Sequence, residues 1–448
     1  MRYIPSTDDD LKAMIDGAGT GSLDDMLAQV PEAIRKESAL DLPPALDELS
    51  LIRHMKRLSS KNAETDSTLT FIGAGAYDHF IPAVVDQLIL RSEFFTAYTP
   101  YQPEISQGTL QAIFEFQTYV CMLTGMDVAN ASMYDGASAL AEAVLMARRI
   151  KKKANKIFIS KAVHPEYRET VLTYTNDLDI EIVEIPYDAE GKTDVDWLKA
   201  NIDSNTAAVA VQYPNFFGVI EDMEAISKVA ADKETLFISA TTEVLALGLI
   251  RPPSEFGVDI AVSEGQSFGN PLGFGGPHLG LFATKSEHIR NMPGRLVGET
   301  TDLDGKRGYV LTLSTREQHI RREKATSNIC SNQSLCALAF AIHISLLGRK
   351  GLRQMAQSNL TLAEYAKNRI SGLEGFSIKF ASPTFNEFVI ETGRPTSEID
   401  KKLLESNIIG GLSLQRFYPE LAGSILFCVT EKIRKEDIDK LAEVLGGC

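Results

Sequence analysis

The fold of this chain is decided by three short apolar runs, Lys156-Ile157-Phe158-Ile159-Ser160, Ala207-Ala208-Val209-Ala210-Val211-Gln212 and Leu236-Phe237-Ile238-Ser239-Ala240. Three more runs of this kind cover residues 180–185, 259–262 and 279–283. Most of the runs lack polar alternation, which is typical of strands buried on both faces of a sheet. Helical stretches lie between them, at residues 166–175, 194–200 and 222–231. This alternation predicts right-handed crossovers and a parallel sheet with helices on both faces.

The regions on either side of these runs have a different character. Residues 1–65 contain short helical pieces, which begin with the capping signal Ser6-Thr7-Asp8 and are interrupted by prolines. Because such short helices need something larger to pack on, we expect a helical arm. After about residue 326 the chain has amphipathic helices at 335–347, 352–370 and 431–445, and strand-like runs at 376–380 and 387–391. The predicted organisation is an arm (1–65), a large α/β domain (66–325) and a small α+β domain (326–448).

The composition excludes several classes of protein. The 448 residues include 45 Lys and Arg against 60 Asp and Glu, which gives a net charge of −15. That acidic balance argues against a protein that coats nucleic acid or an anionic membrane. The acidic N-terminus and the lack of roughly 18 uninterrupted apolar residues predict no signal peptide and no membrane span.

The cysteines show no spacing that is typical of metal sites. Because their number is odd and no secretory signal is seen, we expect reduced thiols, a cytoplasmic location and no bound metal. The five cysteines are Cys121, Cys330, Cys336, Cys428 and Cys448.

The first candidate for chemistry is a proline-braced segment at residues 94–108, FFTAYTPYQPEISQG. Its two prolines stiffen the backbone, so that Tyr98, Tyr101 and the carboxylate of Glu104 can be presented without the entropy cost of a floppy loop. A loop that is buried at a domain seam explains the same pattern equally well.

Two further segments lie next to predicted strands and helices. Residues 133–138 precede a strong helix whose free amides could cradle a phosphate. Asp135 would satisfy the same amides and repel the phosphate, so an ordinary helix cap is favoured. Residues 263–280 contain five glycines after Gln266 but do not open a helix, so a nucleotide-binding loop is not indicated. His278 in this stretch is interpreted as a packed loop histidine.

The last candidate segment, residues 315–328, is rich in cations. Arg316, Arg321, Arg322 and Lys324 fall within nine residues of an acidic chain, and could meet an anionic ligand or partner. The glutamates at 317 and 323 make a salt-bridged helix face an equal alternative.

In this order and spacing, the candidate segments resemble the first half of the glycine-cleavage P-protein, glycine dehydrogenase (decarboxylating). The length of the chain fits the split form of that family, in which two different chains make up the enzyme. The motifs that carry the resemblance are YTPYQPE (98–104), NASMYDG (130–136), GQS (265–267) with FGGP (274–277), and REQHIRREKATSNIC (316–330), extended toward the arm by FIGAG (71–75).

The resemblance implies a fold-type I, aspartate aminotransferase-like fold of the pyridoxal-phosphate (PLP) enzymes. Such enzymes need a lysine for the Schiff base, an acid at the pyridine nitrogen, and amides or hydroxyls for the phosphate. Here Gln266 stands at the lysine position, residues 239–242 read SATT where the acid belongs, with only Glu243 near, and Asp135 stands at the phosphate helix. Three requirements fail together, so we expect this chain to keep the fold but to bind no PLP covalently and to carry no catalytic residue.

PLP is then expected in a sister chain, within an α2β2 heterotetramer. The resemblance implies that glycine loses carbon dioxide there and that the aminomethyl group passes to the lipoyl arm of the H-protein. Tyrosine hydroxyls of this chain would donate hydrogen bonds, and its arginines would meet phosphate or an acidic H-protein surface. The residues expected to support the sister's site are Tyr98, Thr99, Tyr101, Gln102, Glu104, Gln107, Thr315, Arg316, His319, Arg321, Arg322 and Lys324.

Two alternatives remain at this point. The chain could be a self-sufficient PLP aminotransferase or decarboxylase that uses Lys285, which ends a predicted strand beyond the glycine run. It could also be a purely structural scaffold that places no residue in the active site.

Overall fold

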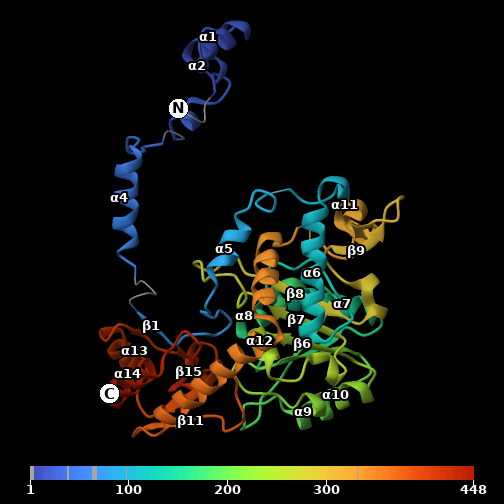
Figure 1. The fold of residues 1–448 in the computed structure, drawn as a ribbon, viewed down its shortest axis with the longest axis vertical. Helices are drawn as coiled ribbons and strands as arrows, with labels where there is room; N and C mark the ends of the chain where they lie inside the picture. Colours follow the sequence, from blue (N-terminus) through green and yellow to red (C-terminus); the bar gives the residue numbers. More distant parts are fainter. Residues whose placement is uncertain (1–4, 38–39, 63–67, 97, 330, 448) are drawn as a thin grey trace. The chain divides into compact units, whose positions relative to one another are not determined.

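The computed structural model describes residues 5–37, 40–62, 68–96, 98–329 and 331–447 (Figure 1). The chain divides into two compact units, Met1–Glu64 and Thr65–Cys448. Helices of the first unit are α1 (Asp8–Gly17), α2 (Leu23–Met26), α3 (Glu32–Glu37) and α4 (Glu48–Ser59). The predicted cap of α1 is confirmed, because Thr7 and Asp10 form a reciprocal capping box. None of the described residues in these four helices is buried.

A seven-stranded sheet forms the centre of the second unit, in the order β2-β8-β7-β6-β5-β3-β4. All six predicted strands are present, and β3 to β7 pair in parallel. The strands are β2 (Val128–Ala129), β3 (Lys156–Ser160), β4 (Glu181–Ile185), β5 (Thr206–Gln212), β6 (Leu236–Thr241), β7 (Ile260–Glu264) and β8 (Gly280–Thr284).

The prediction of a parallel sheet is wrong for β8. This strand runs antiparallel to both of its neighbours, β7 and β2. The connection from β7 to β8 covers residues 265–279 and contains no helix. Without a crossover helix the chain does not return to the other edge of the sheet, so the next strand pairs in the antiparallel sense.

Helices cover both faces of this sheet, as the sequence predicts. Along β3, Ile157 and Ile159 pack with α7 (Gly136–Ile150) and α8 (Pro165–Thr175), whereas Phe158 between them packs in a second core cluster. Successive side chains of a strand point to opposite faces, so an uninterrupted apolar run supplies both cores. The second cluster includes α6 (Gln107–Thr124), α9 (Val195–Asn201), α10 (Met223–Asp232) and the N-terminal part of α12 (Ser334–Ser371).

The C-terminal part of this unit contains a four-stranded antiparallel sheet in the order β11-β12-β15-β14. Its elements are β11 (Phe376–Ile378), β12 (Glu387–Thr392), β14 (Leu412–Ser413), β15 (Ser424–Cys428), α13 (Thr396–Glu405) and α14 (Lys435–Gly446). The short strand β13 (Ile408–Ile409) pairs in parallel with β1 (Leu69–Thr70). A domain boundary at 325/326 stays a prediction, because this unit is not divided further.

Helix α12 joins two segments that the sequence predicts as separate helices. Gly348 lies between them with a non-helical φ of 57°, which marks a kink and explains why the apolar pattern breaks there. By length and hydropathy alone α12 could cross a membrane. A core helix meets the same criteria, and Phe340, Ala341 and Ile344 of α12 are buried in the second core cluster.

The remaining elements connect these layers. A β-hairpin of β9 (Leu296–Thr301) and β10 (Arg307–Thr312) packs on α6. The other helices are α5 (Ala83–Ile89), α11 (Gln318–Arg321), and the 3-10 helices η1 (Pro103–Ile105), η2 (Val244–Gly248), η3 (Pro253–Phe256), η4 (Ser286–Asn291), η5 (Ser314–Arg316), η6 (Arg322–Lys324), η7 (Leu414–Arg416) and η8 (Pro419–Leu421).

Cysteines of the described part of the chain are free thiols, namely Cys121, Cys336 and Cys428. Cys330 and Cys448 lie outside the described residues.

Candidate functional site

Gln266 lies two residues beyond β7, at the carboxyl edge of the central sheet. In open sheets of this kind, ligands bind at that edge. The side chain is buried, and both ends of its amide are engaged: Oε1 accepts from Tyr77 N at 3.0 Å, and Nε2 donates to Asn270 O at 2.7 Å. The residue at the predicted lysine position is therefore a fixed link between two chain segments.

The N-terminus of α7 is closed by two carboxylates. Asp135 accepts from Ser138 N at 2.7 Å, which confirms the predicted cap. Glu264, which the sequence did not single out, accepts from Gly136 N at 2.9 Å through Oε2 and from Gln266 N at 3.0 Å through Oε1. Because these groups use the amides that would hold a phosphate, and repel it, the helix offers no phosphate site.

Tyr77 links the end of strand β6 to strand β12. Its buried hydroxyl donates to Glu387 Oε2 at 2.8 Å and lies 3.2 Å from Thr242 Oγ1. Glu387 Oε1 also accepts from Ala74 N at 2.7 Å. Burial raises the pKa of Glu387 to about 7, although the bonds from Ala74 and Tyr77 oppose this. The carboxyl edge of the sheet is thus packed with bonded polar side chains.

Glu243, the acidic residue that lies two positions after the end of β6, is paired with His79. His79 Nε2 lies 2.8 Å from Glu243 Oε2, and His79 Nδ1 lies 2.8 Å from Glu431 Oε2. Burial lowers the pKa of His79, but the two carboxylates outweigh burial and raise this pKa to about 10. Ser267 Oγ donates to the other oxygen of Glu243 at 2.8 Å. Glu243 is therefore occupied and does not face a ligand.

Lys285 lies at the opposite edge of the sheet. It follows Thr284, which pairs with Ile260 at the beginning of β7, whereas Gln266 lies beyond the end of that strand. Its Nζ is 2.5 Å from Asp259 Oδ1 and 3.2 Å from Gly257 O. A lysine that is paired at the amino edge of the sheet does not reach the carboxyl edge, which argues against the alternative that uses it.

Two of the predicted supporting segments meet at the surface, around Tyr101. The ring of Tyr101 packs edge-on against His319, with centroids 5.4 Å apart. Arg295 Nη2 donates to the hydroxyl of Tyr101 at 3.0 Å. Glu317 Oε2 lies 3.5 Å from His319 Nδ1 and 3.9 Å from Arg295 Nε. Tyr101 is 45% exposed and His319 is exposed, whereas Arg295 and Glu317 are buried, so Tyr101 and His319 are the members of this cluster that another molecule can reach.

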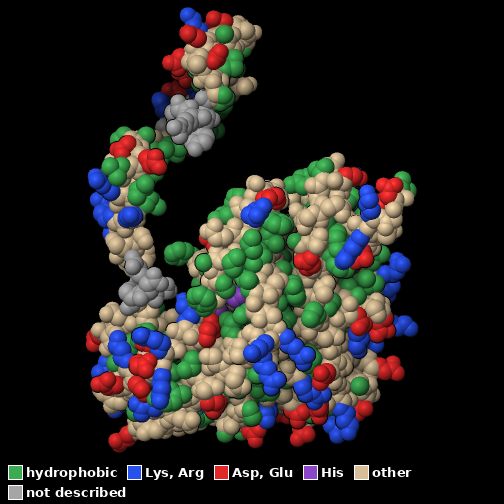
Figure 2. Space-filling model, viewed as in Figure 1, with side chains coloured by type: hydrophobic (Ala, Val, Ile, Leu, Met, Phe, Trp, Pro, Cys, Tyr) green, Lys and Arg blue, Asp and Glu red, His purple; other side chains and the backbone are tan. Residues whose placement is uncertain are grey.

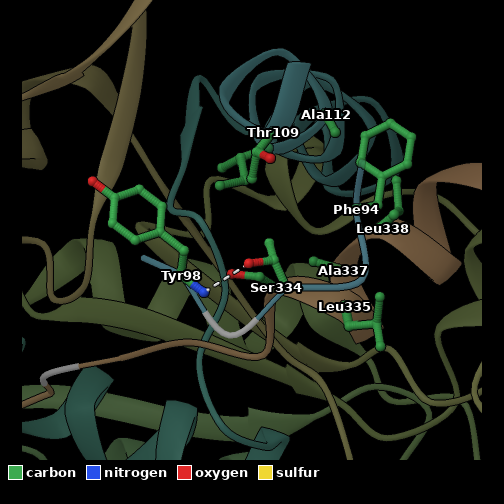
Figure 3. A pocket seen from close by; sticks show the side chains of 10 residues that line it. Phe94, Tyr98, Thr109, Ala112, Ser334, Leu335, Ala337 and Leu338 are labelled. Carbon is green, nitrogen blue, oxygen red and sulfur yellow. Dashed lines mark hydrogen bonds between the residues drawn. The ribbon is translucent and has the colours of Figure 1, made fainter. Parts of the chain in front are cut away.

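Tyr98 lies beside a narrow cavity of about 30 Å³ between the proline-braced segment, α6 and α12. Figure 3 shows Phe94 and Leu338 on one side of this cavity and Tyr98 on the other. The hydroxyl of Tyr98 donates to Gln102 Oε1 at 3.3 Å, and the side chain is 44% exposed. A volume of about one water molecule holds no substrate, so another molecule can reach Tyr98 only at its exposed side. The alternative of a segment buried at a domain seam is not found.

The other predicted residues of this segment have different surroundings. Gln107 anchors it, since its amide exchanges two hydrogen bonds of 2.9 Å with the backbone of Tyr309 in β10. Thr99 is half-buried, and its carbonyl accepts from Tyr101 N at 2.7 Å. Glu104 lies exposed on η1. Gln107 therefore attaches the segment to β10, while Glu104 remains accessible to solvent.

The cationic segment forms two 3-10 turns, η5 and η6, and the four-residue helix α11 between them, rather than one continuous helix. The alternative of a salt-bridged helix face is therefore wrong. Arg316 is half-buried and donates to the carbonyls of Met292 and Gly294, so it supports the loop. The other predicted residues of the segment, Thr315, His319, Arg321, Arg322 and Lys324, are exposed.

Besides Glu264, sequence reasoning missed four residues that organise these regions. Tyr77 and His79 follow the motif at 71–75, which offered a signal, but their partners lie 164 to 352 residues away in the sequence. Arg295 and Glu387 stand in no local pattern. Among the described residues, no group of three or more His, Cys, Asp or Glu side chains is placed to hold a metal ion.

Comparison with solved structures defines the class of fold. The chain is similar to a crystal structure of glycine decarboxylase (P-protein) of the glycine cleavage system in inhibitor-bound form, with 39% identity, a TM-score of 0.91 and full coverage of both chains. It also resembles the fold of a Burkholderia pseudomallei sphingosine-1-phosphate lyase, with a TM-score of 0.69 at 14% identity over 93% of this chain and 94% of that one. The fold is that of the fold-type I PLP enzymes.

Sequence comparison gives the family. The model of the glycine cleavage system P-protein matches residues 1–445. The probable glycine dehydrogenase (decarboxylating) subunit 1 of Desulfitobacterium hafniense is 53% identical and covers 100% of this chain and 99% of its own length. That of Geobacillus kaustophilus is 54% identical, with 99% and 98% covered. The chain belongs to the glycine cleavage system P-protein family.

The residues at the carboxyl edge do not fit PLP. No lysine stands at position 266, Glu243 is bound to His79, and the amides at the start of α7 are taken by carboxylates. We therefore assign no step of the reaction to this edge of the sheet.

Proposed function

We propose that this chain is the cofactor-free subunit of a two-chain glycine dehydrogenase (decarboxylating), whose PLP is held by a sister chain. The overall reaction releases carbon dioxide from glycine and transfers the aminomethyl group to the lipoyl arm of the H-protein. We place the complex, an α2β2 heterotetramer, in the cytoplasm.

One observation carries this proposal: the side chain at the lysine position is an amide whose two ends are both hydrogen-bonded inside the protein. An amide forms no imine. Gln266 is 3% exposed and bonded to Tyr77 and Asn270, so another lysine does not approach without breaking this packing.

An exposed apolar face supports the need for a partner chain. Figure 2 shows hydrophobic side chains gathered over α5 and α12. Phe80, Leu90 and Phe95, which flank α5 in the sequence, are 56–63% exposed, and Leu346 of α12 is 50% exposed. Contiguous apolar surface of this kind marks protein–protein contacts.

Within the complex, this chain would shape the glycine pocket and help to dock the lipoyl arm. Tyr98 and Tyr101 carry exposed hydroxyl-bearing rings, and Gln102 lies beside them. Arg295 and His319 hold the ring of Tyr101 in one orientation. A fixed hydroxyl positions a reacting group at a lower entropy cost than a mobile one.

Cofactor binding by the chain alone tests the proposal. We expect the purified chain with added PLP to give no aldimine absorption band that is lost on borohydride reduction. The Gln266→Lys variant should give none either, because the carboxylates at the start of α7 still exclude the phosphate. Reductive labelling of any lysine of the wild-type chain, Lys285 included, would overturn the proposal.

Reconstitution with the sister chain tests the role of the surface residues. Tyr98→Phe, Tyr101→Phe and Gln102→Ala should each lower the rate of glycine–carbon dioxide exchange by about tenfold, which corresponds to one lost hydrogen bond. Tyr174→Phe, which changes an exposed tyrosine on α8, serves as the matched control. Equal rates for all four variants would favour the pure scaffold.

A further inference from the structure

A second cavity, separate from the carboxyl edge of the sheet, lies beside the cationic segment. Its volume is about 260 Å³. We call it the basic cavity. One of the residues that line it belongs to η4, and the others lie between positions 313 and 326. They are Arg290, Leu313, Thr315, Arg316, Arg321, Lys324 and Thr326.

The charge of the basic cavity is unbalanced. Four of its lining residues are cations and none of the described lining residues is an acid, in a chain whose net charge is −15. Glu317, the carboxylate next to Arg316, lies instead against Arg295 and His319. Like charges that line one cavity repel one another, so a bound anion would stabilise this arrangement.

Donor groups in the basic cavity remain available. Within the described residues, Arg321 forms a side-chain hydrogen bond only through Nε, which donates to Thr315 O at 3.0 Å, so its two terminal nitrogens remain available. Arg290 and Lys324 have no hydrogen-bond or ion-pair partner within the described part of the chain. Two planar guanidinium groups, an ammonium and two threonine hydroxyls are the donor set that binds phosphate oxygens.

The walls of the basic cavity are held in place. Arg316 forms part of the wall, where its terminal nitrogens donate to the carbonyls of Met292 and Gly294 and its carbonyl accepts from Thr326 N at 2.9 Å. Leu313 and Arg322 adopt positive φ values of 55° and 52°. Such backbone conformations cost energy in residues other than glycine, and they persist where the surroundings enforce them at binding loops.

We propose that the basic cavity binds a phosphate group. Its volume lies below the range of about 300–1,000 Å³ that is typical of pockets for drug-sized ligands, which fits one phosphate with ordered water rather than a large organic ligand. The phosphate comes either from the cofactor of the sister chain or from a free phosphate compound. The inference rests on the lining of the cavity and stands without the proposed function.

Titration of the full-length chain alone with inorganic phosphate tests this inference. In a low-salt buffer without phosphate, calorimetry should show one saturable site with a dissociation constant below about 1 mM, which weakens as ionic strength rises. The double variant Arg321→Gln/Lys324→Gln and the variant Arg290→Gln should each bind at least about tenfold more weakly. All the substituted side chains are exposed, and circular dichroism checks that the variants are folded.

Arg322→Gln is the matched control for Arg290→Gln, because this substitution also removes one positive charge, from a residue that is adjacent to Arg321 and whose side chain does not line the cavity. It should bind phosphate as the wild-type chain does. Absence of a saturable site, or equal weakening by Arg322→Gln and Arg290→Gln, would overturn the inference and indicate only a diffuse basic surface suited to an acidic protein.

A second arm identifies the source of the phosphate. The two-chain complex is titrated with PLP, with and without inorganic phosphate. If the sister's cofactor supplies the phosphate, the double variant binds PLP more weakly and inorganic phosphate competes with PLP. If a free compound supplies it, PLP affinity is the same in wild type and variant, and both ligands bind together. The first arm uses no catalytic readout, so its failure is distinguishable from failure of the proposed function.

Discussion

The carboxyl edge of the central sheet and the surface around Tyr101 contain similar side chains in opposite states. At the edge, Tyr77, His79 and Gln266 are buried, and every polar group described above has a partner. At the surface, Tyr98 and Tyr101 are almost half exposed. The difference teaches that the polar side chains at the edge where this fold class binds its ligands are bonded to one another inside the protein, whereas Tyr98 and Tyr101 present their rings at a surface.

Removal of the buried His79 side chain should have the largest effect on the free energy of unfolding. His79→Ala leaves Glu243 and Glu431 facing each other without the cation between them. Breaking a buried pair in this way costs about 3–5 kcal/mol, so the free energy of unfolding in urea should fall by this amount. Lys152→Ala, on the surface, should change it by less than about 0.5 kcal/mol. Similar losses for both would mean that the edge is not a core.

The free energy of unfolding should depend on pH through the buried carboxyl group of Glu387. The pKa of Glu387 is raised from 4.5 to about 7 in the folded chain, so its protonated form stabilises the fold below pH 4.5. That contribution is lost as the pH rises to 7, at a cost of about 3 kcal/mol. The glutamine side chain of the Glu387→Gln variant stays neutral, so its free energy of unfolding should not fall by this amount as the pH rises.

Urea unfolding of both proteins between pH 4.5 and 8 measures the difference. Glu221, whose pKa burial also raises to about 7, is present in both proteins and subtracts out. A constant difference between the two proteins across this range would show that Glu387 is charged throughout.

One substitution made in both regions compares them directly. Tyr77→Phe removes a buried hydroxyl that Glu387 and Thr242 use, and should lower the free energy of unfolding by about 1–3 kcal/mol. Tyr101→Phe should lower it by less than about 0.5 kcal/mol, yet reduce the exchange rate of the reconstituted enzyme. Reversal of this order would place the structural hydroxyl at the surface.

Substitution of Lys285 should have the smallest effect on the free energy of unfolding. Its ion pair with Asp259 is partly exposed, with the lysine side chain 36% accessible, so Lys285→Met should cost about 0.2–1 kcal/mol. Turnover of the two-chain enzyme should be unchanged. A loss of turnover larger than about tenfold would revive the alternative in which this lysine carries the cofactor.

The sequence predicts much of the fold and less of the site. All six predicted strands are present because uninterrupted apolar runs identify buried strands locally. The direction of β8 was missed, since it depends on a connection without a helix. The absence of a lysine at position 266 was visible in the sequence, and so was the cap at Asp135. The sequence did not show that Tyr77, His79 and Glu387 fill the carboxyl edge of the sheet.

By itself, the sequence determined the class of fold, its layers and the loss of the lysine, because strand and helix periods and residue chemistry are local properties. Only the tertiary structure decided which side chains meet. Tyr77 and Gln266 are 189 residues apart, and Tyr101 and Arg295 are 194 apart. No local pattern selects one partner among hundreds at such separations; that choice is made when the sheet, helices and loops pack and each buried polar group must find a partner.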